Sequence, residues 1–259
     1  MTFLEILNKS KLDLTNAILV ADASMGGHYD EFDFKPKDFL RFAKEDLANQ
    51  TNKGLINSLT NSKRAIDCQV DEALSRFGVH DKDEIQCLTN FLNYFDIEEE
   101  LTWKLKLIQA LNLAPSLLVS QTRTLRNKLE HEYRKPPNEE VENAADIAEL
   151  FIKAISHKVL FPETDFFISD KDNHKKGTSF TKVLSIKFKL KKHEFNIILK
   201  QNNDPKEKMT LGKESSAYLG LLRLMNSIDD EFEAMKSYKI ILDMIGHSMP
   251  NDKAKLKHY

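Results

Sequence analysis

The spacing of apolar residues predicts a chain that is helical over its first 158 residues. Apolar side chains recur every three to four positions over residues 36–77 and about 138–155, which is the period of an amphipathic helix. We expect further helices at residues 2–9 and about 12–24, 81–95, 97–113 and 115–135. Residues 1–158 are therefore predicted to form one all-helical bundle.

Proline, glycine and asparagine residues indicate where these helices begin and end. Pro36 suits a first helical turn, and Gly78 suits a helix stop. Pro136 and Pro137 end the helix that Pro115 opens, and Asn138 is expected to cap the next one. The inner face of that last helix is predicted to be Val141, Ala145, Ala148, Phe151, Ile152 and Ile155.

After residue 160 the apolar period changes to two, which is typical of half-buried strands. Leu184, Ile186 and Phe188 alternate with polar residues, and a returning strand over 195–199 completes a predicted hairpin. A short strand at 165–169, polar loops at 170–177 and 201–208, helices at 213–227 and 229–246, and a basic tail at 251–259 complete residues 159–259. The predicted fold is mainly α: a helical bundle followed by a small α+β unit.

The composition excludes an overall polycation. Lys and Arg number 38 and Asp and Glu number 40, so the formal net charge is -2 and any nucleic-acid contact needs a local patch. The lysines of the hairpin (Lys187, Lys189, Lys191 and Lys192) either contact RNA or form an ordinary solvated face, which we prefer. No leader and no membrane-spanning run are visible, which predicts a cytoplasmic protein without membrane contact.

No metal ion or other cofactor is expected from the sequence. Cys68 and Cys87 lie in apolar-periodic segments and are predicted to be buried free thiols. The loop at residues 25–34 contains His28, Asp30, Glu31 and Asp33, but no second ligand cluster is spaced to complete a metal shell. We interpret it as an acidic loop.

One short stretch carries candidate chemistry. Arg126, Asn127, His131 and Tyr133 put a guanidinium, an amide, an imidazole and a phenol within eight residues. A guanidinium clamps phosphate, and an imidazole moves protons near neutral pH. An ordinary surface pair of Arg126 with Glu130, contributing about 0.3–0.5 kcal/mol, is the structural alternative.

The spacing within this stretch restricts the site. Arg126 and His131 are five residues apart, which is about 140° around an ideal helix. One regular helix therefore does not direct both side chains at one atom. Either the helix loosens before Pro136, or a second copy of the chain completes the site.

The run Arg126-Asn-Lys-Leu-Glu-His131 resembles the Arg-polar-x-x-x-His motif of the HEPN superfamily, and its extension to Tyr133 is similar to the form found in HEPN toxins. The resemblance covers roughly residues 35–158 and leaves the C-terminal unit outside. It implies metal-independent RNA cleavage at a homodimer interface. His131 would be the general acid or base, Arg126 would stabilise phosphate charge, and Asn127 would hold the imidazole or the phosphate.

The resemblance also implies partners and products. Cleavage by the ribose 2′-hydroxyl would leave a 2′,3′-cyclic phosphate and a 5′-hydroxyl. Tyr133 would be the acceptor if a partner nucleotidyltransferase antitoxin modifies the protein. The candidate phosphate-positioning cations are Lys128, Arg134 and Lys135.

Three functions follow from these expectations. The first is a HEPN endoribonuclease acting as a prokaryotic toxin or in anti-phage defence, with RNA and other defence-system proteins as partners. The second is a non-catalytic HEPN dimer that serves as a binding or scaffold module, because a fold does not decide a function. The third is a helical interaction protein in which the motif occurs by chance.

Overall fold

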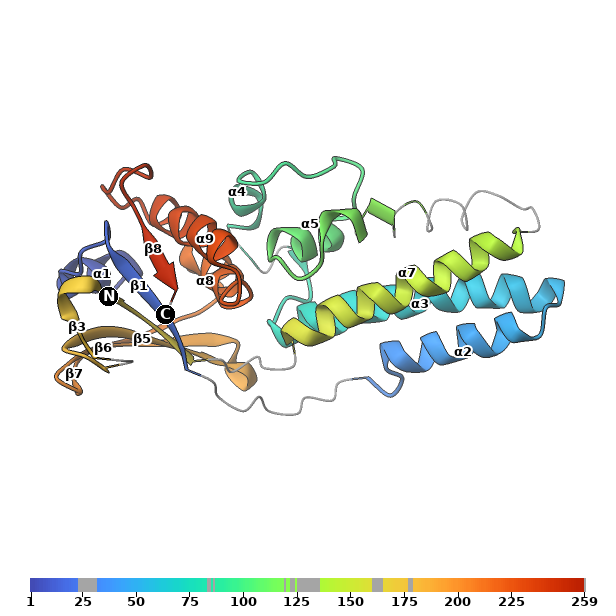
Figure 1. The fold of residues 1–259 in the computed structure, drawn as a ribbon, viewed down its shortest axis with the longest axis horizontal. Helices are drawn as coiled ribbons and strands as arrows, with labels where there is room; N and C mark the ends of the chain where they lie inside the picture. The colour runs from blue at the N-terminus through green and yellow to red at the C-terminus, as the bar shows by residue number, and fades with distance from the viewer. Residues whose placement is uncertain are drawn as a thin grey trace.

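The computed structural model describes residues 1–22, 32–82, 85, 87–118, 120, 121, 124, 136–159, 165–176 and 179–258. Helix α1 (Phe3–Ser10) and strand β1 (Ala17–Asp22) come first. The helices that follow are α2 (Pro36–Ala48), α3 (Asn52–Arg76), α4 (Leu88–Leu92), α5 (Trp103–Ala110) and α7 (Asn138–Val159). Helices α2, α3 and α7 run side by side and extend away from the sheet, which the end of α3 contacts (Figure 1).

The second half of the chain forms most of a sheet. Its elements are β2 (Asp165–Asp170), the 3-10 turn η2 (Lys171–Asn173), β3 (His174–Lys176), β4 (Ser179–Phe180), β5 (Lys182–Lys189), the 3-10 turn η3 (Leu190–Lys192), β6 (Glu194–Gln201), β7 (Asp204–Leu211), α8 (Ala217–Met225), α9 (Glu231–Met244) and β8 (Leu256–His258). Over the described residues, six strands pair in the order β7-β6-β5-β2-β1-β8. All neighbours are antiparallel except β1 and β8, which are parallel.

The prediction of a mainly α protein is therefore wrong. The molecule combines helices with a substantial mixed sheet, and it is an α/β fold rather than a bundle with a small α+β appendage. The sheet includes residues from both sides of the predicted boundary at residue 158, because β1 pairs with β2 from Ala17–Asp170 to Asp22–Asp165. From here on, the α/β unit means residues 1–22 and 165–259, and the helical segment means residues 23–164.

Four strands were predicted as something else, among them β3, which lies in the polar loop predicted at 170–177. Residues 12–24 were expected to be helical, but Ala17 to Val20 form a strand buried on both faces, and such a short apolar run cannot be distinguished from a helix by periodicity. Strand β7 was expected to be a polar loop, and β8 a basic tail. Each is an edge strand, and each takes its backbone hydrogen bonds from a neighbour in the sheet.

The two faces of the sheet are covered differently. Inward residues such as Leu19, Ile186 and Phe195 join one large core with α1, α8 and α9. Tyr218 of α8 lies 5.7 Å from Phe195, centroid to centroid, and its hydroxyl donates to the carbonyl of Phe77 at the end of α3 (2.7 Å). On the other face a smaller apolar cluster contains Ile18, Val20 and Phe180 of the β3–β4 ribbon.

Helices α3 and α7 form as their sequences predict. The Thr51 hydroxyl accepts from the Gly54 amide (3.0 Å) at the start of α3, and Gly78 ends that helix with a φ of 69°. All six residues predicted for the inner face of α7 are buried. The helices predicted at 81–95 and 97–113 are shorter than expected, since α4 and α5 cover only part of them. Within the described residues no helix combines the length and the apolar composition needed to cross a membrane.

Candidate functional site

The residues predicted to carry chemistry lie outside the described residues. They are Arg126, Asn127, Lys128, His131, Tyr133, Arg134 and Lys135. Three residues of the acidic loop, His28, Asp30 and Glu31, also lie outside them. The sequence prediction for these positions therefore stays a prediction.

The described residues on both sides of the motif are anchored to the rest of the protein. On the N-terminal side Leu113 and Ala114 are buried, and Leu118 packs against the core. On the C-terminal side the Asn138 amide donates to Gln50 Oε1 in the turn between α2 and α3 (2.7 Å). Asn138 was expected to cap α7, but its side chain binds this turn instead. The chain that follows the motif, from Asn138 on, therefore lies beside α2 and α3.

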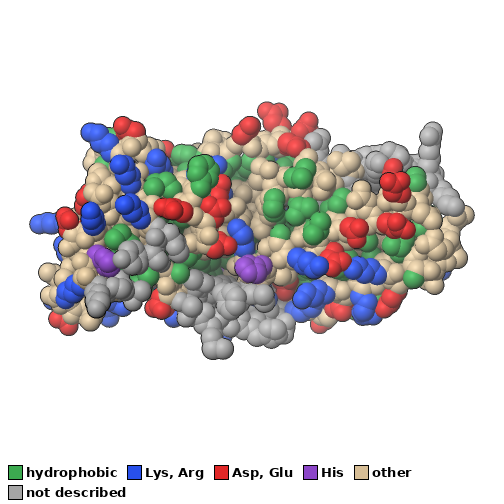
Figure 2. All heavy atoms as spheres, viewed as in Figure 1, with side chains coloured by type: hydrophobic (Ala, Val, Ile, Leu, Met, Phe, Trp, Pro, Cys, Tyr) green, Lys and Arg blue, Asp and Glu red, His purple; other side chains and the backbone are tan. Residues whose placement is uncertain are grey.

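A surface groove of about 590 Å³ lies between α2 and α7. Its apolar residues are Leu40, Ala48 and Ile152, and its charged residues are Lys37, Arg41, Lys44, Glu45, Glu149 and Lys153. Figure 2 shows Lys and Arg side chains beside Asp and Glu side chains in this part of the surface. The groove has an apolar floor and a mainly cationic rim, which suits a ligand with both apolar and anionic groups.

Glu149 links the two walls of this groove. Its carboxylate accepts from Lys153 on the same helix (2.6 Å) and from Lys44 on α2. Hydrogen bonds from Lys153 and then Lys44 lower the pKa of Glu149 to about 2. The carboxylate is therefore ionised throughout the physiological range and is no candidate for proton transfer.

Among the described residues, the one Lys or Arg side chain that is buried is Arg223 on α8. Its side chain is 3% exposed, pairs with Glu233 of α9, and donates to the carbonyl of Ala110 at the end of α5. The guanidinium carbon also lies 4.5 Å from the centroid of the Phe95 ring. Burial lowers the pKa of Arg223, and Glu233 opposes the shift. The contacts of Arg223 with Ala110 and Phe95 join the α/β unit to the helical segment.

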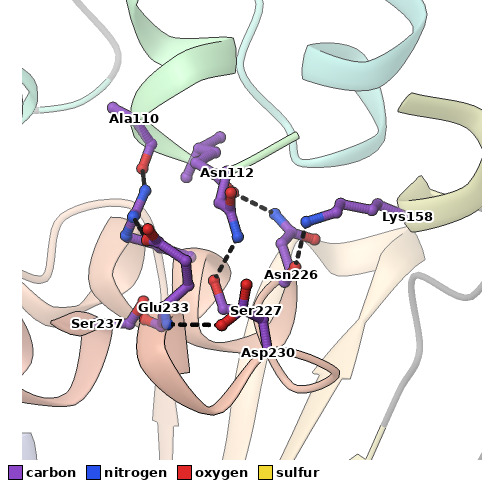
Figure 3. Close-up of polar contacts among 10 residues, drawn as sticks. Ala110, Asn112, Lys158, Asn226, Ser227, Asp230, Glu233 and Ser237 are labelled. Carbon is purple, nitrogen blue, oxygen red and sulfur yellow. Dashed lines mark hydrogen bonds and ion pairs between the residues drawn. The ribbon is translucent and has the colours of Figure 1, made fainter. Parts of the chain in front are cut away.

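A second group of hydrogen bonds continues this junction (Figure 3). The Asn112 amide donates to the Ser227 hydroxyl (3.0 Å), and the Lys158 ammonium at the end of α7 donates to the carbonyl of Asn226 (3.2 Å). Burial lowers the pKa of Lys158, and nearby acids oppose the shift. These hydrogen bonds hold the ends of α5 and α7 on the corner between α8 and α9.

Sequence reasoning missed Arg223, although a signal is present. The residue stands alone in the apolar run Leu221-Leu222-Arg223-Leu224-Met225, and a cation inside a helix that is otherwise apolar must find a buried partner. The thiols were also predicted inaccurately, since Cys68 and Cys87 are free but only half-buried. Burial, with Glu72 and Asp71 nearby, raises the pKa of Cys68 to about 11, which makes it a poor nucleophile.

A smaller hollow of about 370 Å³ lies between α4 and the end of α9. Its polar residues include Asn90, Asn93, Tyr94 and Asp243, and the Tyr94 hydroxyl donates to Asp243 Oδ2 (2.5 Å). Burial and this carboxylate raise the pKa of Tyr94 to about 12. The phenol therefore stays protonated and acts as a donor.

Neither a metal site nor a known relative adds to this description. In the part of the chain that the structure describes, no three His, Cys, Asp or Glu side chains are grouped to hold a metal ion. No protein-family model, no curated protein and no solved structure matches this chain. We therefore base the functional proposal on residues 121–137, which carry the motif, and on the chemistry of these residues.

Proposed function

We propose that this protein is a metal-independent endoribonuclease of HEPN type that acts as a prokaryotic toxin or as an effector of anti-phage defence. The observation that carries the proposal is the set Arg126, His131 and Tyr133, in the Arg-x4-His-x-Tyr spacing, within the helical segment. No metal ligand is required for this chemistry, because an imidazole and a guanidinium supply the proton transfer and the charge stabilisation.

In the proposed reaction the ribose 2′-hydroxyl attacks the adjacent phosphorus. His131 takes or gives the proton, and Arg126 stabilises the negative charge that builds on the phosphate. Asn127 holds the imidazole or the phosphate, and Lys128, Arg134 and Lys135 position the RNA backbone. The bond to the 5′-oxygen breaks, which leaves a 2′,3′-cyclic phosphate and a 5′-hydroxyl.

The spacing of the motif also favours a homodimer. Since Arg126 and His131 are about 140° apart on an ideal helix, two copies related by a two-fold axis would bring the two pairs together. In this proposal Tyr133 is the residue through which a nucleotidyltransferase partner would inactivate the enzyme.

The proposal is tested by incubating the purified full chain with total RNA and tRNA in EDTA. We expect wild type to cut RNA and to leave cyclic-phosphate ends, and His131→Ala and Arg126→Ala to lose about a hundred- to ten-thousand-fold in rate. Matched controls are His157→Ala and Arg64→Ala, because both residues are exposed on helices of the same segment. Their activity should equal that of wild type.

Two results would contradict the proposal. One is cleavage that survives in both motif variants. The other is a folded dimer that cuts none of these RNAs, which would favour a non-catalytic HEPN module that binds a partner instead. Expression in bacteria gives an independent measurement, since wild type should arrest growth and His131→Ala should not.

A further inference from the structure

The charges of the chain are divided unevenly between its two regions. The helical segment, residues 23–164, contains 18 Lys and Arg against 24 Asp and Glu, a net charge of -6. The α/β unit contains 20 Lys and Arg against 16 Asp and Glu, a net charge of +4. The helical segment as a whole therefore gives a polyanion such as RNA no net attraction, whereas the α/β unit attracts it.

Three exposed cations of the α/β unit lie within or just before its C-terminal edge strand β8. Lys253, Lys255 and Lys257 are exposed, and they alternate with the buried residues Ala254 and Leu256. Because alternate residues of a strand point to the same side, Lys255 and Lys257 lie roughly 6.5 Å apart on one side of this edge. Figure 2 shows Lys and Arg side chains gathered over β8 and the neighbouring part of α9.

Lys171 extends this group across the sheet. The Lys255 amide donates to the carbonyl of Leu14 (3.1 Å), and the Lys171 amide donates to the carbonyl of Asn16 (3.2 Å). Both lysines thus lie beside the same short segment before β1. Lys255 comes just before β8, and Lys171 comes just after β2. We call Lys171, Lys253, Lys255 and Lys257 the lysine strip.

Several lysines outside the lysine strip form ion pairs. Lys187 pairs with Asp165 (2.7 Å), Lys104 with Asp71 (2.7 Å), and Lys153 with Glu149 (2.6 Å). Within the described residues, no ion pair involves a lysine of the strip.

Four acids lie near the lysine strip in the chain. They are Asp13, Asp170, Asp172 and Asp252. The carboxylates of Asp13 and of the buried Asp170 already accept hydrogen bonds within the protein. Among exposed side chains, the strip therefore has four lysines against the two carboxylates of Asp172 and Asp252.

We infer that the lysine strip binds the sugar–phosphate backbone of single-stranded RNA and holds the substrate that the helical segment cuts. The inference rests on the proposed function for the identity of the polyanion. Lysine ammonium groups are flexible point charges that neutralise phosphates without reading bases, so binding should be salt-dependent and nearly independent of sequence.

The test measures binding of a fluorescein-labelled, mixed-sequence single-stranded RNA by anisotropy, in full-length protein that carries His131→Ala to prevent cleavage. In this background Lys255→Glu/Lys257→Glu should weaken binding at least tenfold at 100 mM salt. The slope of log K against log salt should fall by about 1.4, the value for two lost phosphate contacts on a single strand. Lys255→Gln/Lys257→Gln, which adds no negative charge, should give a smaller loss in the same direction.

The matched control is Lys206→Glu/Lys208→Glu on β7, which changes two exposed lysines at alternate positions on the opposite edge of the same sheet. It should keep affinity within threefold. Unchanged affinity in the strip variants would overturn the inference and would favour an acidic protein partner as the ligand of the strip. An equal loss of affinity in the control would also overturn it. The proposed function fails separately: strip-dependent RNA binding by a wild-type chain that never cuts RNA would refute the nuclease and keep the strip.

Discussion

Helices α8 and α2 show how differently the two regions of this molecule are built. All nine residues of α8 are buried, so the helix lies at the centre of the core between the sheet, α9 and the end of α3. Helix α2 has 13 residues, of which only Pro36 and Ala43 are buried. Its Leu40 forms part of the floor of an open groove instead.

This contrast indicates a division of labour. The α/β unit, including α8 and α9, provides the stable core. The contacts of Arg223 with Glu233, Ala110 and Phe95 attach the helical segment to this core. Helix α2 leaves apolar and cationic side chains accessible, which is typical of a region that meets a partner or a second copy. The predictions below test this division at the junction first and in the helical segment last.

The largest effect is expected at the buried Arg223. Replacing it with Ala leaves Glu233 without its cation and the Ala110 carbonyl without its donor, and breaking a buried pair in this way costs about 3–5 kcal/mol. Urea denaturation followed by circular dichroism measures the loss. The exposed pair of Arg41 with Glu45 is the control, since Arg41→Ala should cost below about 1 kcal/mol. Similar losses in both variants would contradict the role of Arg223 as the joint.

A smaller effect is expected where α3 meets the β5–β6 hairpin. Gly78 has a φ of 69°, and a Cβ added there would lie 2.5 Å from Cγ of His193. Gly246 has nearly the same φ, 67°, but has nothing within 4 Å of such a Cβ. Both alanine variants should lose about 1–2 kcal/mol from backbone strain. Gly78→Ala should lose more, because the imidazole must move; equal thermal unfolding midpoints would exclude this contact as a constraint.

The smallest effect is expected at the groove between α2 and α7. The Glu149 pKa of about 2 lies below its ordinary 4.5, so the contribution of Glu149 to stability is present above pH 4.5 and is lost between pH 4.5 and 2. Lys44→Met combined with Lys153→Met should raise this pKa toward 4.5, as measured by an NMR titration of the side-chain carboxyl. A pKa that stays near 2 would show that neither lysine is the cause.

Local sequence patterns were sufficient for elements whose burial follows a single period. The inner face of α7 was predicted correctly, and so was the β5–β6 hairpin. Helix α7 begins one residue earlier than expected, at Asn138. The fold class was not, because β1 and β8 become strands only through pairing with each other and with β2, which is 140 or more residues from β1 in sequence. Non-local pairing of this kind leaves no mark in the period of a six-residue segment.

The sequence likewise predicted one part of the candidate functional residues and missed another. Its chemistry was predicted from residue types and spacing alone, and Arg126 and His131 stay predictions until they are tested chemically. The lysine strip was visible only as a basic tail, since its alternation of exposed and buried positions depends on β8 joining the sheet. The junction around Arg223 needed the three-dimensional neighbours Glu233, Ala110 and Phe95 to be recognised.

The most direct test of the account is a single-turnover cleavage assay in EDTA, with enzyme in excess over a labelled RNA. Wild type, His131→Ala and Lys255→Glu/Lys257→Glu are compared over a range of enzyme concentrations. We predict that His131→Ala cuts at least about a hundredfold more slowly than wild type at every enzyme concentration, whereas the strip variant reaches the wild-type rate once the RNA is saturated. Cleavage by His131→Ala at the wild-type rate would contradict the central claim that the motif of the helical segment performs the reaction.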